Sequence, residues 1–254
     1  MGRWSARLAP LFLDFAQVAE ARRLLDIGCG TGTLTKAVRA RSQATEVVGL
    51  DPAWEFIRHL HEQFAGDRAW FHLGDAQCLP YPDSVFDASL GLLVFQEMAA
   101  PERAIMEMAR VTRPGGTVAT CRWDFLSGMT MFSTFWDAVV EVDPDKAAER
   151  SAKKAARPPI ASEQAFADFW RRCGLCNVDT GTVEIAQDFA DLDDFWMPFL
   201  SGATPGSSYV PTLAPETRDA LKNNLRQRLL GDRPDGPFTL PARALVVRGT
   251  VPKA

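Results

Sequence analysis

The 254-residue chain has little of what marks several large classes of protein. Its five cysteines are an odd number in a long chain, so no disulfide framework is implied and a reducing compartment fits. It has no excess of basic residues, and its net charge of -4 argues against nucleic acid as a main partner. No apolar run approaches the length that a bilayer span needs. Residues 1–16 carry several charges and make no convincing signal peptide. We therefore expect a soluble, cytoplasmic protein without a membrane span.

Metal-binding patterns are also scarce. His59 and His61 are two positions apart on a predicted helix, so they do not share a face and do not make a metal pair. Cys173 and Cys176 form a C-x-x-C, but the pair closes a helix at Gly174 and no second pair completes a zinc site. We predict no metal site.

What the chain does contain is a glycine-rich turn. Residues 24–32 read LLDIGCGTG, in which an apolar run leads into three glycines at alternate positions, and a helix-compatible run begins at Thr33. The pattern predicts a buried strand, a turn and a helix start. Glycines allow positive φ and a close approach of the backbone to a ligand. The helix beyond them offers unpaired N–H groups.

The spacing of this turn separates several kinds of nucleotide site. Gly28, Gly30 and Gly32 form G-x-G-x-G, not the G-x-G-x-x-G that cradles a dinucleotide pyrophosphate. No Lys-Ser or Lys-Thr pair follows, which excludes a P-loop. Asp26 lies in the strand just before the turn, where a carboxylate would repel a phosphate but could face an ammonium group. A turn with a structural role and no ligand remains the alternative at this point.

Two further carboxylates follow predicted strands. Residues 46–50 form a short apolar strand that ends at Asp51, 23 residues after Gly28, as expected of the next strand in a βαβ unit. A carboxylate there can accept hydrogen bonds from both hydroxyls of a ribose. Residues 70–73 form another strand, which Asp75 follows closely. Ligands of open α/β sheets bind at such carboxyl ends.

Asp26, Asp51 and Asp75 together suggest the chemistry of the ligand. A molecule that contacts all three would carry an ammonium or similar donor, a ribose diol and an exocyclic amine. It would lack phosphates, because the basic residues of a phosphate clamp are missing there. S-adenosylmethionine fits this description, and a cationic sulfonium is also at home beside aromatic faces.

The remaining pattern is one of alternating strands and helices. Residues 86–93 and 117–121 read as buried strands, with a helix over 101–111 between them, and the alternation predicts a doubly wound parallel sheet. Two late strands, over 178–189 and 242–251, are joined by a long excursion and not by a βαβ helix. They predict an antiparallel pair at the sheet edge.

Two more helices are predicted from apolar stripes. One begins at about Ala9 and precedes the first strand. The other lies in the late excursion and carries Leu221, Leu225 and Leu229 along one face.

Taken in order, these motifs resemble the class I S-adenosylmethionine-dependent methyltransferases, and the chain is most similar to the small-molecule branch that includes the quinone-biosynthesis methyltransferases. The residues that carry the resemblance are LLDIGCGTG at 24–32, VGLDPA at 48–53, GDAQCLPYP at 74–82, Phe86-Asp87 and RPGG at 113–116. The resemblance implies a seven-stranded, mostly parallel, Rossmann-like α/β sheet with an antiparallel last strand. We expect one domain over residues 1–254, with a core at about 20–123 and a helical cap from inserts at about 124–160 and 190–238.

The resemblance also implies a set of cofactor-binding residues for S-adenosylmethionine. Asp26 would face the amino group, directly or through water, the glycines and Leu92 would line the methionine part, Asp51 would take the ribose and Asp75 the adenine amine. The predicted set is Asp26, Gly28, Cys29, Gly30, Asp51, Pro52, Asp75, Ala76 and Leu92.

One segment departs from the family pattern. Where several relatives carry histidine after the fourth strand, residues 94–97 read Val-Phe-Gln-Glu. No catalytic base is predicted, and the catalytic residues remain unknown. Methyl transfer to a good nucleophile depends mainly on alignment and on exclusion of water, so the departure bears on mechanism more than on activity.

Aromatic residues suggest where the methyl acceptor binds. Trp123 and Phe132 lie near the end of the fifth strand, and Trp196 and Tyr209 lie in the late excursion. We expect these two segments to form an apolar lid over the methyl group, which would favour a flat or hydrophobic small acceptor. The alternative is that these side chains pack the core of the cap.

The function predicted from the sequence is S-adenosylmethionine-dependent methyl transfer to a small, apolar or aromatic acceptor. One alternative is a protein that binds S-adenosylmethionine in a regulatory role without turnover. Another is a nicotinamide-dependent oxidoreductase, against which the glycine spacing, the element at Asp75 and the RPGG turn all count. The acceptor and the oligomeric state do not follow from the sequence.

Overall fold

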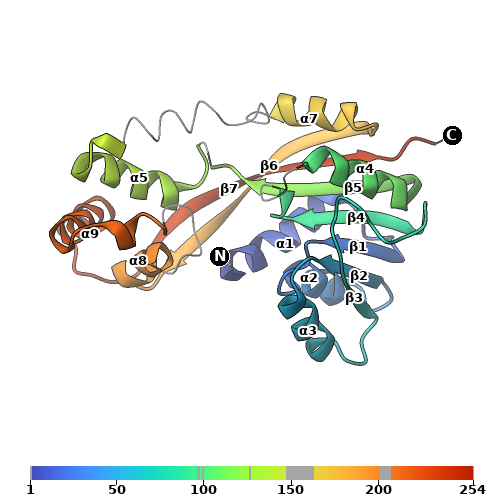
Figure 1. Cartoon of the computed structure of the whole chain (residues 1–254), viewed down its shortest axis with the longest axis horizontal. Helices are drawn as coiled ribbons and strands as arrows, with labels where there is room; N and C mark the ends of the chain where they lie inside the picture. The colour runs from blue at the N-terminus through green and yellow to red at the C-terminus, as the bar shows by residue number, and fades with distance from the viewer. Residues whose placement is uncertain are drawn as a thin grey trace. The chain divides into compact units, whose positions relative to one another are not determined.

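The computed structural model describes residues 2–95, 98, 100–125, 127–146, 163–200 and 207–253 (Figure 1). The chain forms two compact units. The sheet unit comprises Gly2–Arg122, Pro159–Val183 and Ala244–Ala254, and the helical unit comprises Trp123–Pro158 and Glu184–Arg243. That the chain is a single domain with a cap stays a prediction.

Seven strands form one sheet in the order β3-β2-β1-β4-β5-β7-β6. The strands are β1 (Arg23–Ile27), β2 (Glu46–Asp51), β3 (Ala69–Leu73), β4 (Phe86–Leu92), β5 (Thr112–Trp123), β6 (Cys176–Phe189) and β7 (Phe238–Thr250). The first five pair in parallel, as the alternation of strands and helices predicts. Strands β1, β2 and β4 are almost entirely buried, as is typical of parallel strands covered on both faces, whereas the edge strand β3 is partly exposed. The predicted doubly wound fold is confirmed.

The last strand runs against its neighbours. The N–H of Val251 donates to Gly116 and the N–H of Asp124 donates to Arg243, so residue numbers rise along β5 as they fall along β7. The thiol of Cys176, the first residue of β6, donates to the carbonyl of Thr250, the last residue of β7. The start of β6 therefore lies beside the end of β7. The predicted antiparallel arrangement at this sheet edge is confirmed.

Helices cover both faces of the sheet unit. They are α1 (Gly2–Ala16), α2 (Thr33–Arg41), α3 (Trp54–Gln63), α4 (Pro101–Val111) and α7 (Glu163–Arg172). Apolar side chains of α4 and α7, such as Ile105 and Trp170, share one buried cluster with Leu25 and Val48 of the central strands. Arg41 of α2 forms an ion pair with Asp14 of α1 at 2.8 Å.

The first helix begins at Gly2, so the predicted start at Ala9 is wrong. Trp4, Leu8 and Phe12 are spaced four residues apart and are all buried, which extends the apolar face to the beginning of the helix. Pro10 lies inside the helix with its ring exposed. The loss of its N–H therefore removes one helical hydrogen bond without breaking the packed face.

Strand β5 also begins earlier than predicted, at Thr112 and not at Thr117. In the pairing with β4, Phe86 lies opposite Thr112 and Ala88 lies opposite Thr117, so the Arg-Pro-Gly-Gly segment forms an irregularity within the strand. The side chain of Arg113 in this segment bonds to Asp87 at 2.7 Å.

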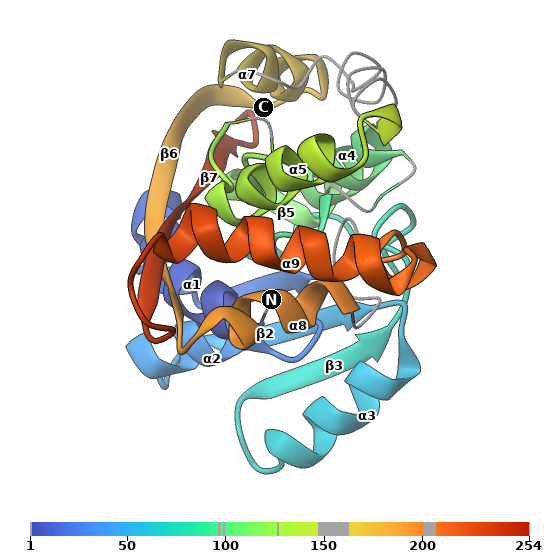
Figure 2. The ribbon, with the colours of Figure 1, turned by 90° about the vertical axis from the view of Figure 1, so that its left-hand side faces the viewer.

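The helical unit is built from α5 (Thr130–Val142), α8 (Leu192–Leu200), the 3-10 turn η2 (Val210–Thr212) and α9 (Pro215–Leu230) (Figure 2). Its core is aromatic: the ring of Phe135 on α5 stacks on Phe199 of α8 at 3.9 Å. The predicted cap inserts belong to this unit as far as the structure describes them, and their residues 126, 147–160 and 201–206 lie outside the described ones. None of the described helices has the length and apolar character needed to cross a membrane.

Candidate cofactor site

The glycine turn joins β1 to α2 as predicted. Gly28, Gly30 and Gly32 have φ values of 64°, 51° and 77°, a region that side-chain-bearing residues rarely adopt. The N–H groups of Gly28 and Cys29 both donate to the carbonyl of Leu50, at 2.8 and 3.1 Å. The N–H of Gly32 donates within the turn, to Cys29.

These bonds bear on what the turn can hold. The N–H of Gly30 also donates, to Asp51 at 2.9 Å. Four N–H groups of the turn, those of Gly28, Cys29, Gly30 and Gly32, are therefore already bonded to protein acceptors. A pyrophosphate cradle would need such donors for itself. The geometry thus agrees with a ligand that has no phosphate at this turn.

Asp51 lies at the end of β2 and is held by backbone donors. Its Oδ2 accepts the N–H of Gly30, and its Oδ1 accepts the N–H of Ala53 at 2.9 Å. A carboxylate has about four acceptor positions. Each oxygen therefore keeps an acceptor position, and the two together suit the adjacent hydroxyls of a ribose.

Asp26 is almost completely buried, with 1% of its surface exposed. Its Oδ2 accepts two hydrogen bonds from Thr35, from the N–H at 3.1 Å and from the hydroxyl at 2.6 Å. Its Oδ1 is buried and has no hydrogen-bond partner among the described residues. Burial raises the pKa of Asp26 to about 7, the hydrogen bonds from Thr35 oppose that rise, and the nearby Asp51 adds to it.

An unfilled acceptor on a buried carboxylate calls for a cationic donor. Without one, the charged form of Asp26 is disfavoured, and the unpaired oxygen costs free energy. The amino group of a methionine-like ligand would supply both a hydrogen bond and a compensating charge. Asp26 thus fits the role that the resemblance implies for it, and the hydroxyl of Thr35, which the sequence prediction missed, orients its carboxylate.

Asp75 follows β3 and is exposed. Its Oδ1 accepts the N–H of Gln77 at 2.9 Å, and the side-chain amide of Gln77 donates to both oxygens at 3.2 Å. These bonds, the backbone one first, lower the pKa of Asp75, so the group is an ionised acceptor suited to an exocyclic amine. Gln77 is itself held by the N–H of Ala100 at 3.2 Å, a support that was not predicted.

Strand pairing brings the second and third carboxylates together. Asp51 pairs with Leu73 in β3, and the N–H of Gly74 donates to the carbonyl of Asp51 at 3.1 Å. Asp75 directly follows Gly74, which bonds to Asp51, so the two aspartates lie near each other at this edge of the sheet. Ala76 beside it is buried.

Two glycines of the turn differ in the space above them. A Cβ on Gly28 would lie 2.3 Å from Cγ2 of Val94, so Val94 covers Gly28. A Cβ on Gly30 would meet nothing nearer than the carbonyl of Gly28 at 3.9 Å. Leu93, between Leu92 and Val94, has a φ of 63°, an uncommon value for leucine. The open space for a ligand is thus at Gly30.

The other predicted cofactor residues are placed as follows. Cys29 is buried with its Cβ near Gly49, and burial raises the pKa of its thiol. Pro52 is exposed just before α3, and Leu92 is half-buried at the end of β4. Gln96 and Glu97 lie outside the described residues, and no catalytic base is assigned.

The four predicted acceptor residues all belong to the helical unit. Trp123, Phe132 and Trp196 are buried, and the last two contact Phe199 through their rings. Tyr209 is half-buried and donates its hydroxyl to Asp143 at 2.8 Å. Phe132 and Trp196 thus pack in the aromatic core of the helical unit, and the role of the four residues as a lid stays a prediction.

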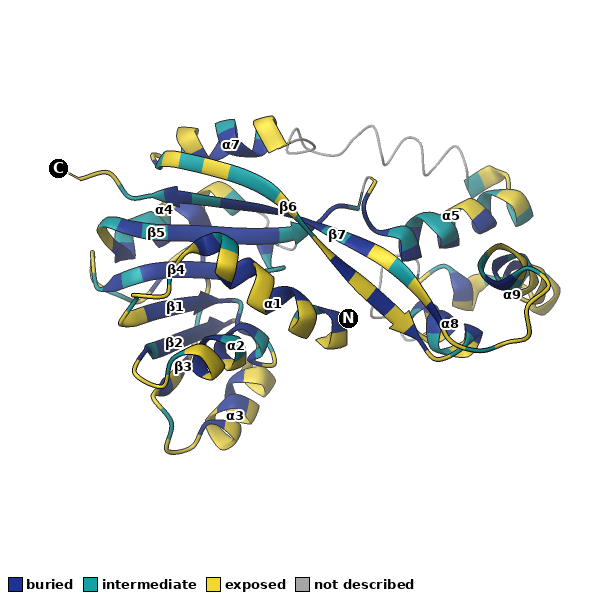
Figure 3. Cartoon of the chain, turned by 180° about the vertical axis from the view of Figure 1, so that it is seen from behind, coloured by how far each residue is buried: buried dark blue, intermediate teal, exposed yellow. Residues whose placement is uncertain are grey.

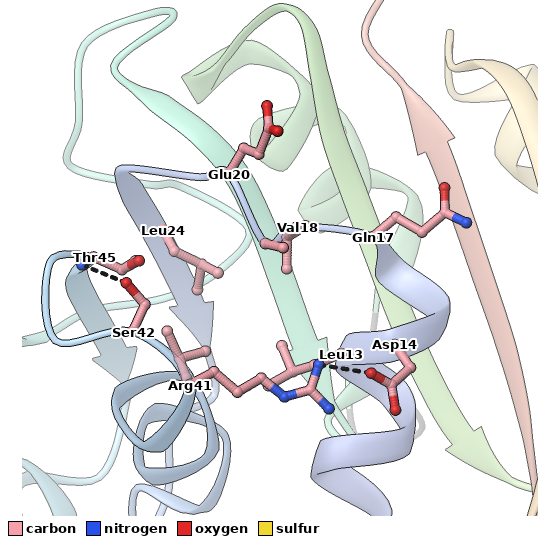
Figure 4. Close-up of a pocket in the computed structure, with 11 residues that line it drawn as sticks. Leu13, Asp14, Gln17, Val18, Glu20, Leu24, Arg41, Ser42 and Thr45 are labelled. Atoms are coloured by element: carbon pink, nitrogen blue, oxygen red, sulfur yellow. Dashed lines mark hydrogen bonds and ion pairs between the residues drawn. The ribbon is translucent and has the colours of Figure 1, made fainter.

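A pocket of about 530 Å³ lies elsewhere in the sheet unit, beside α1, α2 and β1 (Figure 4). Leu24 and Val18 give it an apolar wall, and the ion pair of Arg41 with Asp14 crosses it. None of the predicted cofactor residues lines this pocket. Over the described ranges, no three histidine, cysteine or carboxylate side chains are grouped as a metal site would require.

The sheet order, the antiparallel last strand and the glycine turn with its carboxylates define the class I methyltransferase fold. Residues 25–120 match a family model described as a methyltransferase domain.

Relatives of known name match less than half of the chain. The chain is 36% identical over 116 residues to demethylmenaquinone methyltransferase of Thermus thermophilus, which covers 45% of this chain and 51% of that one. It is 36% identical over 106 residues to malonyl-[acyl-carrier protein] O-methyltransferase of Erwinia pyrifoliae, which covers 42% and 39%. The chain thus spans about half the length of these relatives or less.

Solved structures show the same fold over nearly the whole chain. A candidate type II methyltransferase of Anaeromyxobacter dehalogenans aligns with a TM-score of 0.65 and 18% identity over 97% of both chains. The [4+2]-cyclase SpnF aligns at 0.56 and 20% identity, over 98% of this chain and 82% of that one. Phosphoethanolamine N-methyltransferase 2 of Haemonchus contortus, in complex with S-adenosyl-L-methionine, aligns at 0.53 and 14% identity over 91% and 49%.

Proposed function

We propose that this protein transfers the methyl group of S-adenosylmethionine to a small, apolar or aromatic acceptor. The observation that carries the proposal is the buried Oδ1 of Asp26, an acceptor without a partner among the described residues, next to a glycine turn whose N–H groups are already bonded. The family match over residues 25–120 and the cofactor in the Haemonchus structure support it.

In this proposal each carboxylate has a separate task. Asp26 holds the ammonium group, Asp51 accepts from the ribose hydroxyls, and Asp75 accepts from the adenine amine. When bound, the cofactor supplies an electrophilic methyl group on a sulfonium. The protein fixes the position of the methionine part at Gly30 and excludes water, and such alignment supplies much of the acceleration in transfer to a good nucleophile.

The class of acceptor is proposed from the helical unit. Its core is built from aromatic rings, among them Phe132 and Trp196, and aromatic rings bind flat apolar molecules well. The two named relatives act on different acceptors, demethylmenaquinone and malonyl-[acyl-carrier protein]. The names of these relatives therefore do not identify the acceptor, and its shape and polarity are proposed from the aromatic residues of this chain.

The proposal is tested first by titration calorimetry. We expect S-adenosylhomocysteine to bind and NADH not to bind. Incubation with a cell extract and S-adenosylmethionine carrying a labelled methyl group should then label a small molecule, which mass spectrometry identifies. Binding of NADH in place of S-adenosylhomocysteine would contradict the proposal and favour the oxidoreductase.

A second candidate is a protein that binds S-adenosylmethionine without methyl transfer. The structural similarity to a [4+2]-cyclase favours keeping it, because the fold is thereby compatible with other activities. This candidate predicts tight binding of S-adenosylhomocysteine together with no labelled product from any extract. The same two measurements therefore separate it from the methyltransferase.

A further inference from the structure

Gln187 on β6 is the most unusual buried side chain outside the cofactor site. It is 0% exposed, and neither its Nε2 nor its Oε1, both buried, has a hydrogen-bond partner among the residues that the structure describes. Buried polar groups in native proteins are nearly always paired, so an exception needs a physical explanation. A primary amide is both donor and acceptor, and here no described residue uses either function.

The strand around Gln187 places the amide in apolar surroundings. Towards the end of β6, exposed and buried residues alternate, and Ile185, Gln187 and Phe189 are the buried set (Figure 3). Side chains two apart on a strand lie on the same face, about 7 Å apart. Gln187 is thus a polar residue on the buried, otherwise apolar face of the strand.

That face of β6 belongs to the aromatic core of the helical unit. The ring of Phe189 lies 5.3 Å from that of Phe195 and 5.1 Å from that of Phe238. Phe195 in turn lies 5.6 Å from Phe199, which stacks on Phe135. An aromatic face can accept an amide N–H weakly, but no ring face can donate to Oε1.

We propose that Gln187 is a specificity-determining residue for the methyl acceptor, and that its amide pairs with a hydroxyl or carbonyl group on a flat, otherwise apolar molecule. The inference rests on the proposed function and deepens it. The rings of the helical unit bind the apolar body of the acceptor, and Gln187 selects for one polar substituent. Members of the cluster that are only half-buried, such as Phe125 and Trp136, provide side chains that can move to admit it.

The experiment compares two probes that differ in a single hydroxyl, 2-naphthol and naphthalene, by equilibrium dialysis against the full chain. A site built to pair with a hydroxyl rejects the analogue that lacks it. We expect the wild-type chain to bind 2-naphthol about tenfold more tightly than naphthalene. Gln187→Met, which keeps the volume and removes both polar atoms, should reduce this ratio to near one.

A matched control lies two residues away on the same face. Ile185→Met changes one apolar side chain for another, so the preference for 2-naphthol should survive it. Gln187→Met should also melt at or above the temperature of the wild type, because it removes unpaired polar atoms. A fall of several degrees would show that the fold itself uses the amide, which would overturn the proposal.

Two binding outcomes would also overturn it. One is a wild-type chain that binds neither probe or does not discriminate between them, and the other is a Gln187→Met chain that keeps the full preference. Calorimetry with S-adenosylhomocysteine on the wild type reads the proposed function separately. If S-adenosylhomocysteine does not bind but the preference for 2-naphthol over naphthalene still depends on Gln187, the protein has an aromatic-alcohol site and a different function.

Discussion

The glycine turn and the helical unit are both predicted to bind part of the reaction's substrates, but they are built in different ways. The turn is held by backbone hydrogen bonds to two carboxylates, Asp26 and Asp51, from neighbouring strands. The helical unit is held by ring contacts between α5 and α8, which lie some sixty residues apart in the chain. A charged site of this kind needs few residues in fixed places, whereas an aromatic core tolerates many sequences.

The two regions nevertheless share one informative feature. Each contains a buried polar group that has no hydrogen-bond partner in the described part of the chain, Oδ1 of Asp26 in the one and the amide of Gln187 in the other. In the turn, the glycine motif already indicated a ligand. In the helical unit no motif did, and the unpaired amide is the stronger indication. The comparison implies that the cofactor site and the aromatic core respond independently to mutation.

The largest effect is expected from Phe135→Ala. The ring is fully buried, stacks on Phe199 at 3.9 Å and meets Trp136 edge to face at 5.3 Å. Truncation of a buried phenylalanine leaves a cavity and costs about 3–5 kcal/mol of the free energy of unfolding. Urea denaturation measures this loss. The affinity for S-adenosylhomocysteine should stay unchanged, because every predicted cofactor residue belongs to the sheet unit.

Phe125→Ala provides the control for this loss. Its ring packs on Phe132 at 5.5 Å but is only half-buried, so the destabilisation should be clearly smaller. Should Phe135→Ala not fold, Phe135→Leu retains most of the volume and should lower stability by less. A parallel fall in cofactor affinity, in variants shown to be folded, would mean that the two regions are coupled.

Much of the fold could be predicted because its signals are local. Helix α4 runs over Pro101–Val111 as predicted, since proline marks its start and an apolar stripe its extent. The strands of the sheet unit are short apolar runs between glycines and carboxylates. The start of β5 at Thr112 could not be predicted, because it depends on pairing with Phe86 across an irregularity.

Within the helical unit, α9 lies where the stripe of Leu221, Leu225 and Leu229 predicts a helix, whereas α5 and α8 were not predicted as separate helices. In α5 the polar residues recur at helical spacing, at positions 130, 133, 134, 137 and 141, and this signal went unused. In α8, Pro198 lies inside the helix, which continues around it with Phe195 and Phe199 buried. Tertiary packing decides this case.

The candidate site could be predicted to the level of residue type. The carboxylates and glycines follow from spacing, but the supports Thr35 and Gln77 do not, because their hydrogen bonds depend on side-chain geometry. Gln187 had a signal that went unused: it is a polar residue in the apolar phase of an alternating strand.

The second-largest effect should follow from Asp51→Ala. The change removes an acceptor of two backbone N–H groups, from Gly30 and Ala53, and in the proposed function it also removes the contact with the ribose. Hydrogen bonds to charged groups contribute about 1.5–3 kcal/mol each. We expect calorimetry to show a loss of affinity for S-adenosylhomocysteine of about 100-fold or more.

Asp87→Ala is the matched control for loss of backbone support. Asp87 also accepts two backbone N–H groups, from Arg22 at 2.8 Å and Arg23 at 2.9 Å, but at the opposite end of β1 from the turn. It should destabilise the sheet unit and leave cofactor affinity within about twofold of the wild type. Equal losses in the two variants would assign the effect of Asp51 to the fold and not to a ligand.

The smallest effect, and the one most specific to the turn, is a pH dependence of cofactor affinity. Burial raises the pKa of Asp26 to about 7, so below that pH the ligand-free protein holds a proton there. An ammonium group needs the ionised carboxylate, and binding must then release that proton. Affinity for S-adenosylhomocysteine should therefore fall as the pH drops through 7, by at most tenfold per pH unit, and should level off above it.

Asp26→Asn separates this proton from all others. Its side-chain oxygen can still accept from Thr35, and its NH2 group then stands where Oδ1 does, so the affinity should be low at every pH and lose its dependence near pH 7. Calorimetry at several pH values, in buffers of different ionisation enthalpy, counts the protons released. A pH profile of the same shape in the wild type and in Asp26→Asn would show that Asp26 does not face the amino group. The proposed difference between the glycine turn, which depends on charged carboxylates, and the helical unit, which depends on ring packing, would then lose its main support.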